Sequence, residues 1–500
     1  MDDPLHAICQ EFEINDDRFK AIVNGFCEEY IHGLNTPSAS GLATMIPSYV
    51  TQLPTGHERG TFLALDLGGS HLRVSAVELQ GAGAVVVIKE VRRTISNAQR
   101  TGTVDVFFDW IADAVHGLLV ELRMIHRRLA MGVSWSFPLD LSTGKVLRMG
   151  KGFTLEGIDG QDLATLFHDA FKRKALQVVV TAILNDAVGA LVAHAYKQPK
   201  TAGALIYGTG VNAAYSEKVA RIGKLSHSTD NETKNKAKNK NRNKNNHLAS
   251  TGGGMMLLNT ELDIFGNPSY LPLTRFDISL DQSHSQPEFQ TYEKMMSGAY
   301  LGELTRLIAM ELIDQHYLFD GHVPTELHEP WQYTTAAMSE FEGRKSDEER
   351  LLHFNMSFPH VSSSRSSQDG AKSMSESCYS PTLQDAHRFG CICRTVSSRA
   401  AALLAAAIIS LIEQQQITDD NVYIGINGST YEKYPLMPER IQAAIDRWYG
   451  GKKQVHIDIA NDGASIGGAL VAMMYAPKSS NVTSVAEWRS MMMILSFHPA

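Results

Sequence analysis

A strand, a glycine turn and a second strand follow one another twice in this 500-residue chain, and this repeated hairpin constrains the fold more than any other feature. The first copy covers residues 61–78 and turns at Gly68, and the second covers residues 204–217 and turns at Gly208. In each copy an apolar run typical of a buried strand leads into the turn. The repeat predicts two hairpins that face each other across a cleft.

The first turn carries groups suited to phosphate and magnesium. Backbone N–H groups at Gly68 and Gly69 can approach an anion closely, and Ser70 adds a hydroxyl. Asp66 could hold Mg²⁺ through water, and Arg73 could neutralise phosphate charge. A Gly-Gly turn after a strand is more often only a turn, so the second copy gives the argument its weight. Two such hairpins would hold the phosphates of a nucleotide from both sides.

Composition sets wide limits on the kind of protein. A hydrophobic fraction of 43% and a charged fraction of 20% predict a large core and two or more domains. The net charge of −8 gives no general attraction to nucleic acid or to an anionic membrane. We find neither a leader pattern nor an apolar stretch of membrane-spanning length, so we expect an intracellular protein, in the cytoplasm, with the nucleus or an organelle surface as alternatives. The few cysteines lack Cys-x-x-Cys spacing and fit a reducing compartment: Cys9, Cys27, Cys378, Cys391 and Cys393.

The remaining patterns predict alternating helices and strands, as in an α/β chain. Apolar residues at helical spacing predict helices over residues 16–34, 104–123, 161–174, 292–317 and 396–414, and one beginning near Ala464. Apolar runs predict strands over residues 84–95, 129–135, 176–184, 422–426 and 455–459. Polar residues follow two of these strands, at Ser136 and at Asn185 and Asp186, where ligands of α/β folds usually bind.

Two segments interrupt this pattern. Residues 233–247 alternate lysine or arginine with asparagine and contain no apolar anchor, which predicts a disordered loop. Residues 357–382 are dense in serine and predict a flexible surface insertion. Polyanion binding or nuclear import through the first segment, phosphorylation of the second, and protein partners through either remain open alternatives.

The chain also carries groups suited to a sugar. A polyhydroxylated substrate needs carboxylates, amides and lysine together, because each hydroxyl both donates and accepts hydrogen bonds. One carboxylate could take the proton from an attacking hydroxyl in phosphoryl transfer. Several sequence blocks, in order, resemble the hexokinase family of the actin-like ATPase superfamily. The resemblance extends from about residue 16 to residue 475, and the residues within the blocks are similar to those of the atypical fungal members. The blocks are Leu65-Asp-Leu-Gly-Gly-Ser-His-Leu-Arg-Val, Ser136-Phe-Pro, Lys151-Gly-Phe, Asn185-Asp186, Gly208-Thr-Gly-Val-Asn, Asn259-Thr-Glu261, Tyr292-Glu-Lys, Gly428-Ser-Thr and Asp462-Gly.

The resemblance implies an α/β, two-domain, actin/hexokinase-like (ribonuclease H-like) fold with a cleft between the domains. It implies that residues 1–59 form a helical part of the large domain, 60–186 the small domain, 187–463 the large domain, 464–477 a helix returning to the small domain, and 478–500 a tail. It also implies that Asp186 is the general base toward the 6-hydroxyl of a hexose. The hexose would be held by Ser136, Lys151, Asn185, Asp186, Glu261 and Glu293. MgATP would be held by Asp66, Gly68, Gly69, Ser70, Arg73, Gly208 and Thr209, with Ser429 and Gly463 near the adenosine.

The chain departs from the family pattern at several of these blocks. Acidic residues replace glycines near each sugar-binding glutamate, at Asp263 and Glu288, and threonines beside the sugar are replaced by Gly150 and Ala187. Other departures are His71 in the first turn and Ala464 with Ser465 after Gly463. Each lost hydrogen bond or positioned donor typically costs about 1–4 kcal/mol of transition-state stabilisation. The pattern therefore favours a hexose-binding protein with weak or lost phosphotransfer and a regulatory, carbon-sensing role. An active ATP-dependent hexokinase and a scaffold that binds no ligand are the alternatives.

Overall fold

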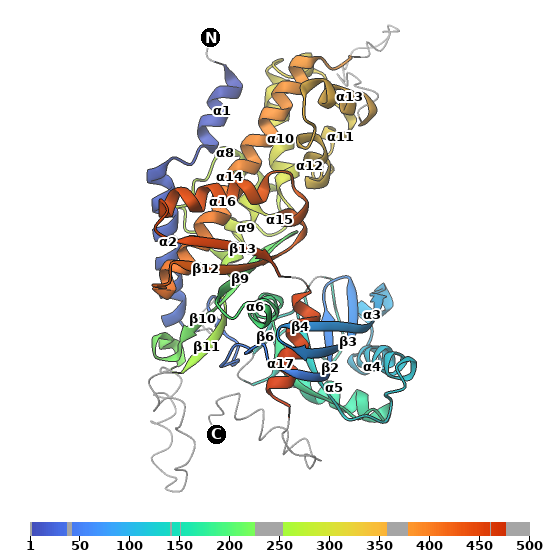
Figure 1. The fold of residues 1–500 in the computed structure, drawn as a ribbon. Coiled ribbons are helices and arrows are strands. Elements are labelled where there is room, and N and C mark those ends of the chain that lie inside the picture. The colour runs from blue at the N-terminus through green and yellow to red at the C-terminus, as the bar shows by residue number, and fades with distance from the viewer. Residues whose placement is uncertain are drawn as a thin grey trace, which may run out of the picture.

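The structure, a computed structural model, describes residues 3–37, 43–140, 143–150, 152–225, 254–357, 379–460 and 462–476. Two mixed sheets lie in two lobes of the molecule (Figure 1): strands β2, β3 and β4 lie in the lobe at the lower right, and β9, β12 and β13 lie in the other. The predicted sugar ligand Lys151, the lysine- and asparagine-rich segment, most of the serine-rich segment and the predicted tail lie outside the described residues.

The first sheet has five strands in the order β4-β3-β2-β5-β8. Strands β2, β3 and β4 form an antiparallel meander, and β5 and β8 run parallel to β2. Alternate residues of β2 enter two different cores, because Leu63 and Leu65 pack with α4 and α5 whereas Ala64 packs with α17. The strands are β2 (Arg59–Leu67), β3 (His71–Gly81), β4 (Ala84–Thr94), β5 (Leu129–Trp135) and β8 (Val178–Leu184), with a separate pair β6 (Leu139–Asp140) and β7 (Lys145–Val146).

The second sheet has six strands in the order β1-β11-β10-β9-β12-β13 and repeats this design. Here β9, β10 and β11 form the antiparallel meander, and β12 and β13 run parallel to β9. The predicted hairpins are therefore confirmed, one in each sheet: Leu67 pairs with Leu72 across a four-residue connection, and Tyr207 pairs with Val211 across a three-residue one. The strands are β1 (Ile46–Pro47), β9 (Thr201–Tyr207), β10 (Val211–Lys218), β11 (Met255–Asn259), β12 (Asn421–Asn427) and β13 (Gln454–Ile459).

Helices cover both sheets, and α6 packs against β9, β10 and the turn that precedes α17. The helices of the first half are α1 (Pro4–Phe12), α2 (Asp16–Asn35), α3 (Asn97–Thr101), α4 (Val104–Glu121), α5 (Leu163–Arg173) and α6 (Asp186–Lys197). Those of the second half are α8 (Arg275–Ser283), α9 (Thr291–Met296), α10 (Leu301–Asp314), α11 (Thr325–His328), α12 (Thr335–Glu342), α13 (Asp347–Ser357), α14 (Leu383–Gln415), α15 (Ser429–Lys433), α16 (Met437–Tyr449) and α17 (Gly468–Met474). Single turns are η2 (Val219–Arg221), η3 (Leu262–Ile264), η4 (Phe319–Gly321) and η5 (Gly463–Gly467).

Helix α14 is longer than the sequence predicts. It begins at Leu383, 13 residues before the predicted start at residue 396, after a capping box in which Thr382 and Asp385 bond each other's backbone N–H groups. Among the described helices it alone is long and apolar enough to pass the test for a membrane span, but 83% of that apolar stretch is buried inside the protein. It is the central core helix of the second lobe, in agreement with the burial that its composition predicts.

The single helix predicted over residues 292–317 is wrong. The structure divides it into α9 and α10, with a break at residues 297–300. Within the break, the N–H of Gly298 donates to the carbonyl of Gly208 and the N–H of Ala299 donates to that of Thr209, both at 2.9 Å. These backbone groups bond the turn of the second hairpin instead of a helix, so a tertiary contact overrides the local helical pattern.

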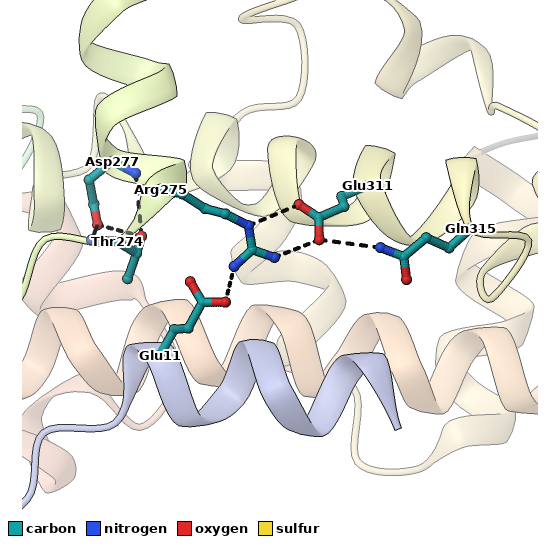
Figure 2. A network of polar contacts seen from close by, with 6 residues as sticks. All are labelled: Glu11, Thr274, Arg275, Asp277, Glu311 and Gln315. Atoms are coloured by element: carbon teal, nitrogen blue, oxygen red, sulfur yellow. Dashed lines mark hydrogen bonds and ion pairs between the residues drawn. The ribbon is translucent and has the colours of Figure 1, made fainter. Parts of the chain in front are cut away.

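An exposed ion-pair network ties three helices together at the outer end of the second lobe (Figure 2). Arg275, the first residue of α8, donates to Glu311 on α10 through Nε at 3.2 Å and Nη2 at 2.5 Å, and also to Glu11 on α1. Asp277, two residues later, forms a capping box with Thr274 at the start of α8. Exposed pairs of this kind stabilise a fold only modestly, by up to about 1 kcal/mol each.

Candidate active site

Three predicted site residues lie at one edge of the first sheet. Strands β2, β5 and β8 are parallel, so Asp66, Ser136 and Asn185 lie at or just beyond their carboxyl ends. Asn185 caps α6, because its Oδ1 accepts from the N–H of Ala187 at 2.8 Å. Asp186 is the first residue of that helix. Topology therefore gathers groups that are as many as 120 residues apart in the sequence.

The first hairpin holds an arginine against its own carboxylate. Arg73 donates to Asp66 Oδ2 through Nε at 3.0 Å and Nη2 at 2.7 Å, and its Nη1 lies 3.5 Å from Asp462 Oδ1. These two carboxylates raise the pKa of the guanidinium, against the effect of its partial burial. Between the strands, Gly68 donates to the carbonyl of His71, and Ser70 is exposed.

These residues fit MgATP. A carboxylate, a hydroxyl, a guanidinium and a glycine turn form a donor set for phosphates and for one magnesium ion. Among the described residues, no group of three or more His, Cys, Asp or Glu side chains is placed to hold a metal ion by itself. That suits Mg²⁺, which is usually held by one or two carboxylates together with substrate phosphates.

The second hairpin turn lies against the start of α15. The Gly208 carbonyl accepts from Thr430 Oγ1 at 2.7 Å, and a Cβ atom on Gly208 would lie 3.5 Å from the Ser429 nitrogen. Thr209, at the tip of the turn, is exposed. Three residues predicted for the nucleotide, Gly208, Thr209 and Ser429, are therefore neighbours. Gly463, the fourth predicted there, is buried against the backbone of α6, where a Cβ atom would lie 2.7 Å from the Ala190 nitrogen.

The same turn positions Glu293 on α9. Glu293 Oε2 accepts from the N–H of Val211 at 2.9 Å. A Cβ atom on Gly210 would lie 2.6 Å from this oxygen, so the carboxylate lies directly against the glycine backbone. The second hairpin thus carries Thr209, predicted to bind the nucleotide, at its turn. At the start of its second strand, it bonds Glu293, predicted to bind the sugar.

Glu261 follows β11 in a left-handed backbone conformation, with φ of 48°. Its Oε1 accepts from the amide groups of Asn259 and Asn212, and these two amides also bond each other at 3.0 Å. A non-glycine residue in this conformation is uncommon and costs of the order of 1 kcal/mol or more. Asn212 and Asn259 are not among the predicted site residues, although both belong to blocks that resemble the family. The available signals were an asparagine two residues after a glycine turn, Asn212, and an asparagine at the end of an apolar run, Asn259.

Four carboxylates influence one another here. Burial raises the pKa of Glu261 to about 7, with further contributions from the charges of Asp263 and Asp186. Burial also raises the pKa of Asp263 to about 6, and the charge of Glu293 adds to this, while the Gln290 side chain opposes it by donating to Asp263 Oδ2 at 2.7 Å. The charge of Asp186, which follows β8 of the first sheet, thus acts on Glu261, which follows β11 of the second.

The residues that depart from the family pattern occupy different environments in the structure. Glu288 is exposed, so only Asp263 adds a carboxylate to the buried cluster. Ser465 is buried, with its hydroxyl 3.2 Å from that of Ser75 in the first sheet. The N–H of Ala187 is bonded by the side chains of both Asn185 and Asp186. The start of α6 therefore keeps its cap although alanine occupies position 187.

Two family models, each described as hexokinase, match residues 4–196 and 202–474. The chain belongs to the hexokinase family. Hexokinase-1 of Schizosaccharomyces pombe is 30% identical over 97% of this chain and 93% of its own, and hexokinase-2 of Candida albicans is 30% identical over 94% and 91%. The structure titled hexokinase from Schistosoma mansoni complexed with glucose aligns with a TM-score of 0.73 at 28% identity, covering 94% of this chain and 98% of its own. The predicted fold is confirmed.

The buried carboxylates predict how the stability of the ligand-free protein depends on pH. The folded-state pKa values of Glu261 and Asp263, about 7 and about 6, lie above their ordinary values. Their contribution to folding is therefore complete at low pH and is lost as the pH rises through about 6 and 7. Each unit by which a pKa differs between folded and unfolded protein corresponds to about 1.4 kcal/mol.

We expect the double variant Glu261→Gln/Asp263→Asn to gain stability relative to the natural protein as the pH is raised from acid to neutral. Urea unfolding of both proteins across that interval measures the difference, and titrations elsewhere in the chain cancel in the comparison. A difference in the free energy of unfolding that does not change with pH would contradict the assigned burial of the two charges.

Proposed function

We propose that this member of the hexokinase family is an active enzyme that transfers the terminal phosphate of MgATP to the 6-hydroxyl of a hexose. The observation that carries the proposal is the anchoring of the two glutamates: Glu261 Oε1 accepts from the amides of Asn212 and Asn259, and Glu293 Oε2 accepts from the N–H of Val211. Asp186, the predicted base, begins α6 just after β8, and its charge contributes to the raised pKa of Glu261, which supports one site formed by both lobes.

In the proposed reaction, Glu261 and Glu293 accept hydrogen bonds from sugar hydroxyls and orient the ring. Asp186 accepts the proton of the 6-hydroxyl as its oxygen attacks phosphorus. Arg73, Ser70 and the glycine turns would hold the phosphate oxygens, and Asp66 would hold through water the magnesium ion that neutralises their charge. Closure of the lobes around the sugar would exclude water and favour transfer to the sugar over hydrolysis.

The alternative of a sensor with little or no turnover, which the sequence favours, receives less support. Glu288 is exposed, the hydroxyl of Ser465 lies against that of Ser75 in the first sheet, and the start of α6 keeps its cap. No departure removes an ionisable group from the predicted machinery. The family membership and the similarity to proteins named hexokinase favour the enzyme over both the sensor and the scaffold.

Two measurements on one preparation of the full chain distinguish these hypotheses. Calorimetry measures hexose binding, and a coupled assay measures ATP-dependent formation of hexose 6-phosphate. We expect turnover of roughly 1–1000 per second. Binding without turnover would instead support a sensor, and the absence of both would support a scaffold.

A further inference from the structure

An open groove in the second lobe is lined by three aromatic side chains. Its volume is about 440 Å³, and the residues that line it are Ser283, His284, Ser285, Ala299, Tyr300 and Trp331. They come from the end of α8, the break before α10 and the connection between α11 and α12. A space of this size, with mostly apolar walls and a few polar groups, is typical of a site for a small molecule.

The rings of His284, Tyr300 and Trp331 contact one another at steep angles. The His284 centroid lies 5.7 Å from that of Tyr300 and 5.8 Å from that of Trp331, with the ring planes inclined by 70° and 61°. The Tyr300 and Trp331 centroids are 6.2 Å apart, at 75°. The rings therefore form walls of the groove instead of a flat stack. Because the faces of an aromatic ring are negative, they attract a positively charged group.

Hydrogen bonds hold two of these rings in place. The N–H of Gln286 donates to His284 Nδ1 at 3.2 Å, an acceptor role that only a neutral imidazole can fill. The backbone N–H of Trp331 donates to Glu303 Oε2 at 2.7 Å. The neutral imidazole does not repel a cation, and a wall that is ordered before a ligand arrives lowers the cost of binding.

The charges around the groove favour a cationic ligand. Burial raises the pKa of Tyr300 to about 12, and the negative charges of Glu293 and Asp263 add to this effect. Lys294 carries a positive charge on the neighbouring helix α9, but its Nζ is paired with Asp281 Oδ1 at 2.6 Å. The charges that act on Tyr300 are therefore negative, and they attract a cation and repel an anion.

We propose that the groove formed by His284, Tyr300 and Trp331 binds a small alkylammonium ion, an organic cation whose nitrogen carries alkyl groups. The ring faces attract the charge, and the alkyl groups match the apolar walls. A metal ion fits less well, because Mg²⁺ and Ca²⁺ need oxygen ligands and the described residues include no group of three or more His, Cys, Asp or Glu placed to hold a metal. The inference is independent of the proposed reaction, since none of the residues lining the groove is a predicted sugar or nucleotide ligand.

The test compares choline with 3,3-dimethylbutan-1-ol, which has the same shape but no charge. Ligand-observed NMR titrations of the full chain at pH 8 measure the dissociation constant of each compound. We expect choline to bind more tightly than the neutral alcohol. Trp331→Leu should weaken choline binding about twofold to thirtyfold, because it removes the ring that attracts cations most strongly. Trp331→Phe keeps an aromatic face and should lie between the natural protein and Trp331→Leu.

Trp448→Leu is the matched control, because Trp448 lies on α16 and packs against Phe19 instead of lining the groove. It should leave choline binding unchanged. Equal binding of choline and the neutral alcohol would overturn the proposal, since recognition would then depend on apolar contact alone. Choline binding that fails to saturate in the natural protein, or that Trp331→Leu does not weaken, would also overturn it. If Trp331→Leu does not fold, the milder Trp331→Phe decides the question by the same comparison.

Discussion

Replacing Asp186 with alanine is expected to lower kcat for hexose phosphorylation by about 100-fold to 10,000-fold, which is the usual contribution of a positioned general base. Hexose affinity should change much less, because Glu261 and Glu293 remain in place on the second lobe. The start of α6 should also survive, since Asn185 still caps it through the N–H of Ala187. Turnover is measured by the coupled assay and affinity by calorimetry.

Asp186→Asn sharpens this test, because it keeps the shape of the side chain and removes only its ability to take a proton. Asp105→Asn is the matched control, since Asp105 lies in the first turn of α4 in the same lobe and its side chain is 75% exposed. We expect the control to keep its full activity. Wild-type turnover in Asp186→Asn would show that another group accepts the proton.

Arg399→Met is expected to reduce the free energy of unfolding by about 3–5 kcal/mol, because it leaves the buried charge of Asp277 without a partner of opposite charge. The Arg399 side chain on α14 is fully buried and donates to the two oxygens of Asp277 at 2.6 and 2.7 Å, with its guanidinium over the ring of Phe12. Without the arginine, Asp277 remains 4% exposed and unpaired in charge. Urea unfolding measures the loss.

Two variants test the cause of that effect. Arg275→Met removes an arginine that also contacts two carboxylates but is 47% exposed, and it should cost under about 1 kcal/mol (Figure 2). Adding Asp277→Asn to Arg399→Met should recover part of the stability, since no buried charge is then left alone. An Arg399→Met variant as stable as Arg275→Met would contradict the explanation.

The same ion pair supports the candidate site. Arg399 Nη2 also donates to the carbonyl of Met295 on α9, at 3.2 Å, and α9 carries Glu293 two residues earlier. Arg399 therefore links the central core helix to a predicted sugar ligand. Calorimetry on Arg399→Met below its unfolding transition would show whether hexose affinity falls together with stability.

Much of the local structure could be predicted from the sequence, because hairpins and helices depend on near neighbours. The helix predicted over residues 16–34 is α2, which Asn15 caps, and the strand predicted over residues 129–135 is β5. Both glycine hairpins also form as predicted. Apolar periodicity, capping residues and turn glycines act over a few residues, so the pattern that forms these elements is also visible in the sequence.

In the candidate site, local sequence patterns predict the residue types but not their burial or their long-range contacts. The sequence alone, through its ordered blocks, determined the family, the two hairpins and the residues expected to bind sugar and nucleotide. Only the tertiary structure decided that α9 and α10 separate, because Gly298 and Ala299 bond a turn about 90 residues earlier. It also decided that Asp263 is buried beside Glu261 while Glu288 is exposed. Burial and charge depend on which distant segments pack together, and no local pattern in the chain encodes that.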